Sequence, residues 1–336
     1  MKRQRSSNSI IQQSEGNEVL RLDDLVHQLK SFRGLSRKID LHDILSVFNE
    51  TAYDDAGFLD VGNFKVVISC DGIVESIVKD NPWLAGYYCV ITNVGDVAAK
   101  GARPVGFVNI ISSSSSSIRR GIAEGIKYGM NKYGLILLKG HTHPDTSYDA
   151  VSGAVIGVSK KIIPSTTAKA GDSLILAVDL DGKFESKGWL KTFDSVSSKS
   201  TKKVLHQLDS LVEISEKSLA SAAKDLSSPG IIGTIAMLCE SSRVGAIVNV
   251  QNIPLPSGVT LADWLTTYPS TGFIIATRKP KECSQILRNH DLTAAEIGKI
   301  TEDKKIWLHL MDKSALFMDL NYESVFGMCA AQRSGM

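Results

Sequence analysis

The chain lacks the features that mark secreted, membrane-embedded or nucleic-acid-binding proteins. Its 336 residues include five cysteines, none in a Cys-x-x-Cys pair, and this odd, scattered set suits a reducing compartment better than a disulfide framework. No apolar run reaches the roughly 20 residues that a membrane-spanning helix needs, and no apolar signal segment follows the first basic residues. The formal net charge is only +2. We therefore expect a cytoplasmic protein with no membrane or nucleic-acid partner.

The composition of the chain is that of an ordinary globular protein. Hydrophobic residues make up 43% of the chain and charged residues 22%, enough for two domains with their own cores. Residues 1–16 are polar and are expected to form a disordered tail. A small, polar stretch around residues 164–171 separates two runs of alternating patterns. These features predict an N-terminal domain over residues 17–165 and a C-terminal α+β domain over residues 166–336.

Hydrophobic periodicity places the elements of both domains. The predicted strands cover residues 65–70, 104–111, 135–138, 151–159, 172–178, 244–250, 272–277, 296–300 and 306–310. The predicted helices cover residues 18–32, 82–102 and 118–133, two stretches within 201–224, a helix opening at 227–230 and ending at 242, and 280–289.

One strand runs into a cluster of groups that bind metals or phosphates. Residues 135–138 read as a short buried strand, and Lys139-Gly140-His141-Thr142-His143-Pro144-Asp145 follows it. In an extended segment His141 and His143 project to the same side, which suits zinc or iron and suggests a metallohydrolase. The usual signature of that class has a further histidine after the aspartate, where this chain has Thr146. The metallohydrolase is therefore the third of three hypotheses.

Several aspartates stand near the ends of apolar segments or on a helix of small residues, where a carboxylate is costly unless it meets a positive group. They are Asp54, Asp55, Asp71, Asp96 and Asp145. Oxygen ligands gathered from several loops suit Mg²⁺ carrying a polyphosphate. Aspartate also favours turns for local hydrogen-bonding reasons, so a purely structural role is the alternative for each.

The order of these segments resembles a known superfamily. The chain has DDA at 54–56, SCDG at 69–72, NVGDVAAKGA at 93–102 and KGHT at 139–142. This succession is similar to the AIR synthase (PurM-like) superfamily, which includes AIR synthetase, thiamine-monophosphate kinase, selenophosphate synthetase and HypE. Among its branches, the chain most resembles the AIR synthase-related proteins.

The resemblance implies a two-domain α+β (α/β) fold and a homodimer. The N-terminal mixed sheets of two copies would pair into a barrel-like interface, with ATP and Mg²⁺ bound near it. The γ-phosphate would go to an unidentified small-molecule substrate, so the leading hypothesis is an ATP- and Mg²⁺-dependent synthase or kinase.

The resemblance also assigns roles to residues. Mg²⁺ would be held by Asp55, Asp71, Asp96 and Asp145. The nucleotide would be bound by these first three aspartates together with Asp54, Asn93, Gly140, His141 and Thr142. The residues assigned to catalysis are His141, Thr142 and Lys38, with Arg37 as the other candidate for the nearby cation.

Two positions depart from the superfamily pattern. Lys139 replaces the first glycine of the usual Gly-Gly, and Pro229 replaces the second acid of the Asp-x-Ser-Asp-Gly motif that begins here at Asp225. Both changes favour the second hypothesis, a dimer that binds nucleotide without turnover and serves as an assembly or maturation partner.

Overall fold

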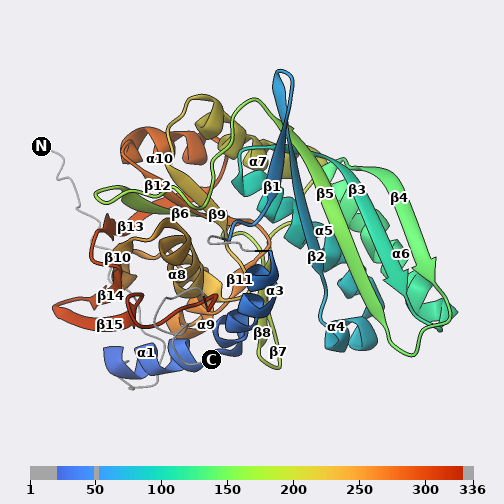
Figure 1. Ribbon diagram of the computed structural model, residues 1–336, viewed down its shortest axis with the longest axis horizontal. Helices are drawn as coiled ribbons and strands as arrows, with labels where there is room; N and C mark the ends of the chain where they lie inside the picture. Colours follow the sequence, from blue (N-terminus) through green and yellow to red (C-terminus); the bar gives the residue numbers. More distant parts are fainter. Residues whose placement is uncertain (1–20, 49–52, 328–336) are drawn as a thin grey trace, which may run out of the picture.

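A computed structural model describes residues 21–48 and 53–327. The predicted tail, 1–16, and the first residues of the helix predicted at 18–32 lie outside these ranges. Two sheets organise the molecule, one built from residues 57–159 and the other from residues 173–319 (Figure 1). The fold is thus a two-domain mixture of α and β structure, as predicted.

The first sheet has five strands in the order β1-β2-β5-β3-β4. It is mixed, because β3 and β4 run parallel while the other neighbouring pairs are antiparallel. Its strands are β1 (Gly57–Val61), β2 (Phe64–Gly72), β3 (Arg103–Ser112), β4 (Ile136–His143) and β5 (Ala150–Ser159). Helices α5 (Pro82–Ala99) and α6 (Ser116–Tyr133) cover one face, and the short α4 (Glu75–Asp80) precedes them.

The helices α5 and α6 approach closely because glycines lie at their crossing. A Cβ added at Gly125 would overlap the carbonyl oxygen of Trp83, and one added at Gly86 would overlap that of Ile122. Only glycine allows this backbone contact. The close crossing fixes where α5 presents its side chains.

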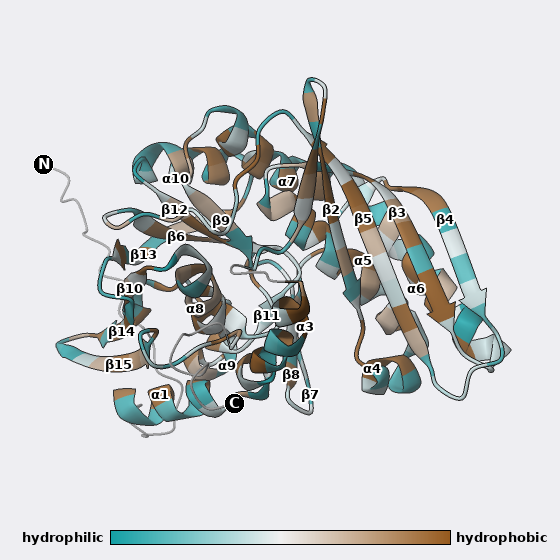
Figure 2. Ribbon diagram, viewed as in Figure 1, coloured by the Kyte–Doolittle hydropathy of each residue, from teal (hydrophilic) through white to brown (hydrophobic). Residues whose placement is uncertain are grey.

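The opposite face of the sheet is apolar and uncovered in the described chain (Figure 2). Along β2, Val67 and Ser69 are buried toward α5, whereas Ile68 between them is exposed. The exposed apolar residues on this face include Leu59, Val61, Phe64, Ile68, Ile110, Leu138 and Val158. We call these seven residues the open face. A patch of this kind usually marks an interaction surface.

The second sheet has seven strands in the order β15-β14-β10-β13-β6-β12-β9. Its strands are β6 (Ser173–Val178), β9 (Ala222–Asp225), β10 (Gly245–Asn249), β12 (Gly272–Thr277), β13 (Thr293–Thr301), β14 (Lys305–Leu310) and β15 (Lys313–Asp319). The helices among them are α7 (Thr201–Glu216), α8 (Gly230–Ser242), η2 (Val250–Asn252), α9 (Leu261–Leu265) and α10 (Pro280–Asn289). A small third sheet joins β7 (Lys183–Lys187), β8 (Leu190–Asp194) and β11 (Tyr268–Pro269).

The N-terminal helices pack on the second sheet rather than the first. They are α1 (Leu22–Ser31), α2 (Arg33–Ser36), η1 (Arg37–Leu41) and α3 (His42–Val47). Leu25 and Leu29 of α1 share a core cluster with residues of α8 and the second sheet, and Lys30 donates to Glu323 at 2.8 Å. This packing carries η1 to the junction of the two domains.

Most predicted elements are confirmed, with two corrections. Residues 201–224 do not form two helices: α7 ends at Glu216, and residues 222–225 form β9, an edge strand of the second sheet whose four residues are all buried. Of the strand predicted as buried at 135–138, only Leu135 is buried; residues 136–138 belong to β4, an edge strand whose eight residues are all exposed. It also continues through His143, just before Pro144. None of the described helices is long and apolar enough to cross a bilayer.

Candidate functional site

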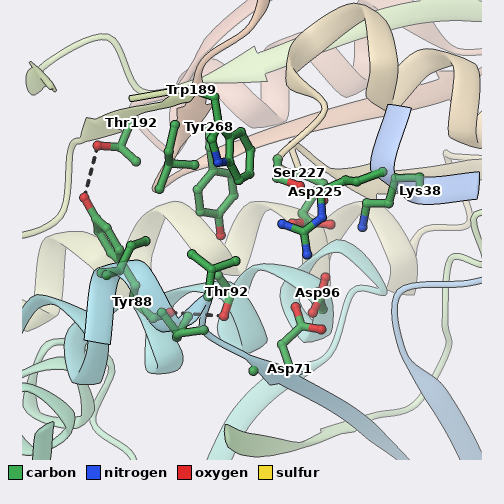
Figure 3. Close-up of a pocket in the computed structure, with 17 residues that line it drawn as sticks. Lys38, Asp71, Tyr88, Thr92, Asp96, Trp189, Thr192, Asp225, Ser227 and Tyr268 are labelled. Atoms are coloured by element: carbon green, nitrogen blue, oxygen red, sulfur yellow. Dashed lines mark hydrogen bonds between the residues drawn. The ribbon is translucent and has the colours of Figure 1, made fainter. Parts of the chain in front are cut away.

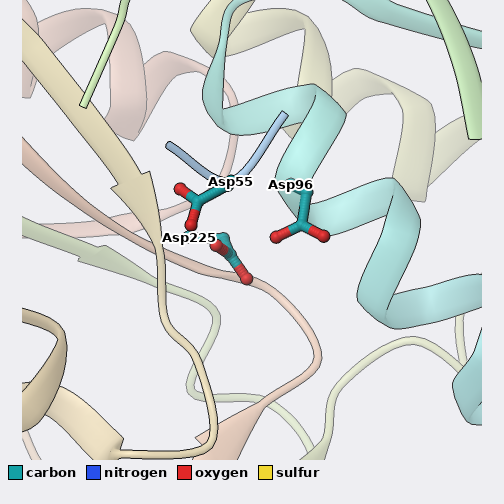
Figure 4. A group of neighbouring side chains, drawn as sticks. All are labelled: Asp55, Asp96 and Asp225. Atoms are coloured by element: carbon teal, nitrogen blue, oxygen red, sulfur yellow. The ribbon is translucent and has the colours of Figure 1, made fainter. Parts of the chain in front are cut away.

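Three carboxylates from three separate elements meet at the domain junction (Figure 4). Asp55 precedes β1, Asp96 lies on α5, and Asp225 ends β9. One oxygen of each lies within 4.8 Å of the others. We call Asp55, Asp96 and Asp225 the acidic centre. Like charges at this spacing repel strongly in a buried site, so the arrangement calls for a cation.

The electrostatics of the acidic centre fit a hard metal ion. Asp55 Oδ2 and Asp225 Oδ1 are buried and accept no hydrogen bond, although Lys100 Nζ lies 3.3 Å from Asp55 Oδ2 as an ion pair. Burial, reinforced by Asp225 and Asp71, raises the pKa of Asp96 well above its ordinary value. Burial also raises the pKa of the adjacent Asp71, although Lys38 opposes this shift. Buried carboxylate oxygens that accept no hydrogen bond are ligands that Mg²⁺ would use, and the donor set therefore fits that ion.

Two buried lysines hold the turn that carries Asp55. Lys100 Nζ donates to Asp54 Oδ1 at 2.5 Å and to the carbonyl of Ala223 at 2.9 Å, and Lys224 Nζ pairs with Asp55 Oδ1. Each lysine side chain is only 2% exposed. Burial lowers the pKa of Lys224 to about 8. Asp54 therefore supports the site through Lys100 and Ser165, whose backbone N–H donates to Asp54 Oδ2 at 2.9 Å.

Asn93 positions the end of β2 against α5. Its Oδ1 accepts from the backbone N–H of Asp71 at 3.0 Å, and its Nδ2 donates to the carbonyl of Cys89 at 2.8 Å. Ser69 Oγ donates to Asp96 Oδ2 at 2.6 Å. Asn93 is fully buried, and both its amide oxygen and its amide nitrogen are hydrogen-bonded to backbone groups of the protein. It therefore serves to orient Asp71.

A pocket opens beside these carboxylates (Figure 3). Asp71, Asp96 and Asp225 line it together with Arg37 and Lys38 of η1, which supply positive charge. Burial lowers the pKa of Lys38, and Asp71 and Asp96 oppose that shift. The Arg37 guanidinium lies 5.6 Å from the ring centre of Trp189. A phosphoryl group bound here would meet both cationic side chains and metal-binding oxygens.

The structure does not bring the β4 residues to the acidic centre of the same chain. Two strands, β5 and β3, separate β4 from β2, which carries Asp71. Gly140, His141 and Thr142 lie on β4, and Asp145 lies in the exposed turn after it. The rings of His141 and His143 are 4.7 Å apart, so they share one side as predicted. Among the residues that the structure describes, no third metal ligand joins them.

Sequence reasoning missed three residues of the site, Asp225, Lys100 and Lys224. Asp225 was visible as the first residue of the altered Asp-x-Ser motif, and Lys100 lies within the NVGDVAAKGA segment. Because helical structure was predicted over 201–224, the strand β9, which carries Lys224 and Asp225, was not predicted. No local signal distinguishes these two lysines from exposed ones.

Comparison with known proteins finds matches over most of the chain. The family model described as AIR synthase related protein, N-terminal domain, matches residues 53–159, and its C-terminal counterpart matches residues 154–310. An uncharacterised protein of Methanocaldococcus jannaschii is 34% identical over 92% of this chain and all of its own length. The thiamine-monophosphate kinase of Pyrococcus abyssi is 28% identical over 61% of this chain and 68% of its own. The selenide, water dikinase of Salmonella typhimurium is 28% identical over 64% of this chain and 63% of its own.

Solved structures share the fold at low identity. PurL of Thermotoga maritima complexed with ADP has a TM-score of 0.71 and 18% identity, covering 91% of this chain. This chain spans 52% of the length of that PurL chain. The ThiL structure complexed with AMPPCP and TMP has a TM-score of 0.63 and 17% identity, covering 83% of this chain and 96% of ThiL. These likenesses establish the two-domain architecture.

Proposed function

Because this chain belongs to the AIR synthase-related family, we propose that it is an ATP- and Mg²⁺-dependent synthase or kinase that transfers the γ-phosphate to a small molecule. The acidic centre carries the proposal, since two of its buried oxygens accept no hydrogen bond and one oxygen of each of its carboxylates lies within 4.8 Å of the others. Relatives named as a kinase and a dikinase, and a fold neighbour solved with AMPPCP, support the same chemistry.

Phosphoryl transfer suits what this site contains. The reaction needs charge neutralisation and alignment more than a protein nucleophile. We assign Mg²⁺ binding to Asp55, Asp96 and Asp225, with Asp71 beside them at the end of β2. Bound Mg²⁺ would neutralise the charge of the transferred group. Lys38 and Arg37, which line the same pocket, would hold the phosphate oxygens.

We propose that the protein is a homodimer formed through the open face. Two apolar sheet faces of this kind can pack on each other and remove their side chains from water. His141, Thr142, Gly140 and Asp145 would then reach a nucleotide at the partner's acidic centre, because β5 and β3 separate them from their own. The assigned roles of these four residues, together with the position of Lys139 beside them, depend on that arrangement.

A matched pair of variants tests the assignment of the acidic centre. Asp96→Asn and Asp225→Asn keep side-chain size but remove one carboxylate each, so we expect both to abolish stabilisation by AMPPCP plus Mg²⁺ in a thermal shift assay. Asp312→Asn, in the exposed turn between β14 and β15, is the control and should behave as the parent protein. Undiminished Mg²⁺-dependent stabilisation in both acidic-centre variants would overturn the assignment.

One observation favours a second candidate, a nucleotide-binding dimer that acts as an assembly partner without turnover. Ser228 and Pro229 stand where the Asp-x-Ser-Asp-Gly motif of the kinases, counted from Asp225, has Asp-Gly, so the second acid is missing; Pro229 directly precedes α8. Retained AMPPCP binding without ATP consumption over a broad panel of acceptors would support this candidate. No observation supports the metallohydrolase hypothesis, since the histidine pair has no third ligand among the described residues.

A further inference from the structure

The hydroxyl of Tyr268 has no part in the metal and phosphate binding assigned to the acidic centre. Tyr268 is the first residue of β11 and lines the pocket together with Asp71, Asp96 and Asp225. Its hydroxyl points into the pocket, in the direction of α5 (Figure 3). Among the residues that the structure describes, none forms a hydrogen bond with this hydroxyl. A hydroxyl held at a pocket wall in this way is free to bond a ligand.

Strand pairing fixes the place of the Tyr268 ring. β11 runs parallel to β8 with Tyr268 opposite Thr192, and the backbone N–H of Ser270 donates to the carbonyl of Phe193 at 2.9 Å. Pro269 follows directly, which restricts the backbone of Tyr268 to extended conformations. The ring therefore starts from a strand position that is held from both sides, and a group presented in this way is positioned more precisely than one on a loop.

The surroundings of Tyr268 make its hydroxyl a hydrogen-bond donor. A phenol already keeps its proton at neutral pH in water. Burial raises the pKa of Tyr268 well above its ordinary value, and the charges of Asp225 and Asp96 add to this shift. No carboxylate accepts a hydrogen bond from it, however. The hydroxyl thus lies close enough to the acidic centre to feel its charge but does not touch it.

A phosphoryl group on Mg²⁺ would fill the space between this hydroxyl and the acidic centre. Mg²⁺ lies about 2 Å from each of its oxygen ligands, so a phosphoryl group bound to it projects beyond the carboxylates into the pocket. Arg37 and Lys38, which line the same pocket, have no ion-pair partner among the described residues. These cations and the Tyr268 hydroxyl are all donors, and the oxygens of a phosphoryl group accept from donors of both kinds.

We propose that Tyr268 is a catalytic residue of the phosphoryl transfer, whose hydroxyl donates a hydrogen bond to a non-bridging oxygen of the terminal phosphoryl group. This inference rests on the proposed function. No bond to Tyr268 forms or breaks in this role, and the hydroxyl keeps its proton. Its contribution is electrostatic, because a fixed donor stabilises the charge that these oxygens carry in the transition state.

The nucleoside end of ATP is the other group that could meet this hydroxyl, because the pocket also reaches Thr92 and Tyr88. A comparison of two nucleotides separates the two positions. ADP has the same base, the same ribose and the first two phosphates, but it lacks the terminal phosphoryl group of AMPPCP. A hydrogen bond to the terminal group is therefore lost only with AMPPCP, whereas a bond to the nucleoside is lost with both.

The test measures binding of AMPPCP and of ADP, each with Mg²⁺, to the full chain by isothermal titration calorimetry. Tyr268→Phe should weaken AMPPCP about tenfold, the usual loss for one hydrogen bond to a charged group, and leave ADP unchanged. Without nucleotide, the midpoint of urea unfolding should not fall, because the hydroxyl has no partner in the protein to lose.

Tyr128→Phe is the matched control. The Tyr128 hydroxyl lies outside the pocket and donates to the carbonyl of Ser197 at 3.0 Å. Its removal should lower the midpoint of urea unfolding and leave the affinities for AMPPCP and ADP as they are in the parent protein.

Three results would overturn the role of Tyr268. They are an equal loss of affinity for AMPPCP and ADP in Tyr268→Phe, an unchanged affinity for AMPPCP, and a urea midpoint that falls as far as in Tyr128→Phe. In each case the parent protein still binds AMPPCP with Mg²⁺, so the proposed function stands. A parent protein that binds neither nucleotide would refute the proposed function and the role of Tyr268 together.

Discussion

At the scale of single residues, the buried carboxyl of Asp96 makes the metal-free protein less stable, although the same carboxyl is the proposed ligand of Mg²⁺. The carboxyl is buried on α5 beside two other aspartates, and its pKa is raised by burial first and by Asp225 and Asp71 next. A raised carboxyl pKa means that the folded state holds a proton that the unfolded chain releases. Stability of the metal-free protein must therefore fall as the pH rises.

We predict that this pH dependence is visible in denaturant unfolding. The loss of stability should begin above pH 3.8, the ordinary aspartate pKa, and continue until the pH passes the folded value. Asp96→Asn should flatten the curve and stabilise the metal-free protein at neutral pH. Mg²⁺ should stabilise the parent protein but not the variant. A variant with the same pH slope as the parent would contradict the account.

Lys100 offers a second residue-scale prediction. Replacement by methionine keeps most of the packing but leaves Asp54 and the carbonyl of Ala223 without their buried donor. We expect Lys100→Met to lower the free energy of unfolding by about 3 kcal/mol, the usual loss when one partner of a buried ion pair is removed. The control is Lys217→Met, whose partner Glu213 is on the surface. If Lys100→Met and Lys217→Met change the midpoint of urea unfolding equally, the buried ion pair of Lys100 does not stabilise the protein as we expect.

At the scale of elements, the α5–α6 crossing sets the site because α5 carries both Asn93 and Asp96. Gly125→Ala would push a methyl group into the Trp83 carbonyl. Overpacking of this kind costs about 2 kcal/mol, and we expect the melting temperature to fall accordingly. At Gly57 an added methyl group meets nothing within 4 Å, so Gly57→Ala is the control. If Gly125→Ala and Gly57→Ala have the same melting temperature, α5 and α6 can move apart without a loss of stability, which would contradict the close crossing as the reason for glycine.

The element most difficult to predict was β9. Its sequence, Ala-Ala-Lys-Asp, has good helix formers and no alternation of polar and apolar residues, because all four residues are buried on both sides. Local pattern therefore favoured a continued helix. Pairing with β12 decided the outcome, and that partner lies about 50 residues further along the chain.

At the scale of the whole molecule, the open face predicts the assembly. We expect the protein to elute as a dimer in size-exclusion chromatography with light scattering, and Leu59→Asp together with Ile68→Asp to convert it to a monomer. Both side chains are exposed on the first sheet, at 64% and 38%. Tyr322→Asp changes a residue that is 74% exposed elsewhere and should leave the dimer intact. A double variant that remains dimeric would place the interface on another surface.

The sequence by itself determined the family, the two-domain α+β architecture and the segments that contain Asp55, Asp71 and Asp96, because turn chemistry and hydrophobic period are local properties that neighbouring residues encode. Only the tertiary structure decided which groups meet. It added Asp225, Lys100 and Lys224 to the site. It placed Gly140, His141 and Thr142 on an edge strand and Asp145 in the turn after that strand, away from the acidic centre of their own chain. Convergence of this kind depends on strand pairing and helix packing between distant segments, and no short stretch of sequence carries that information.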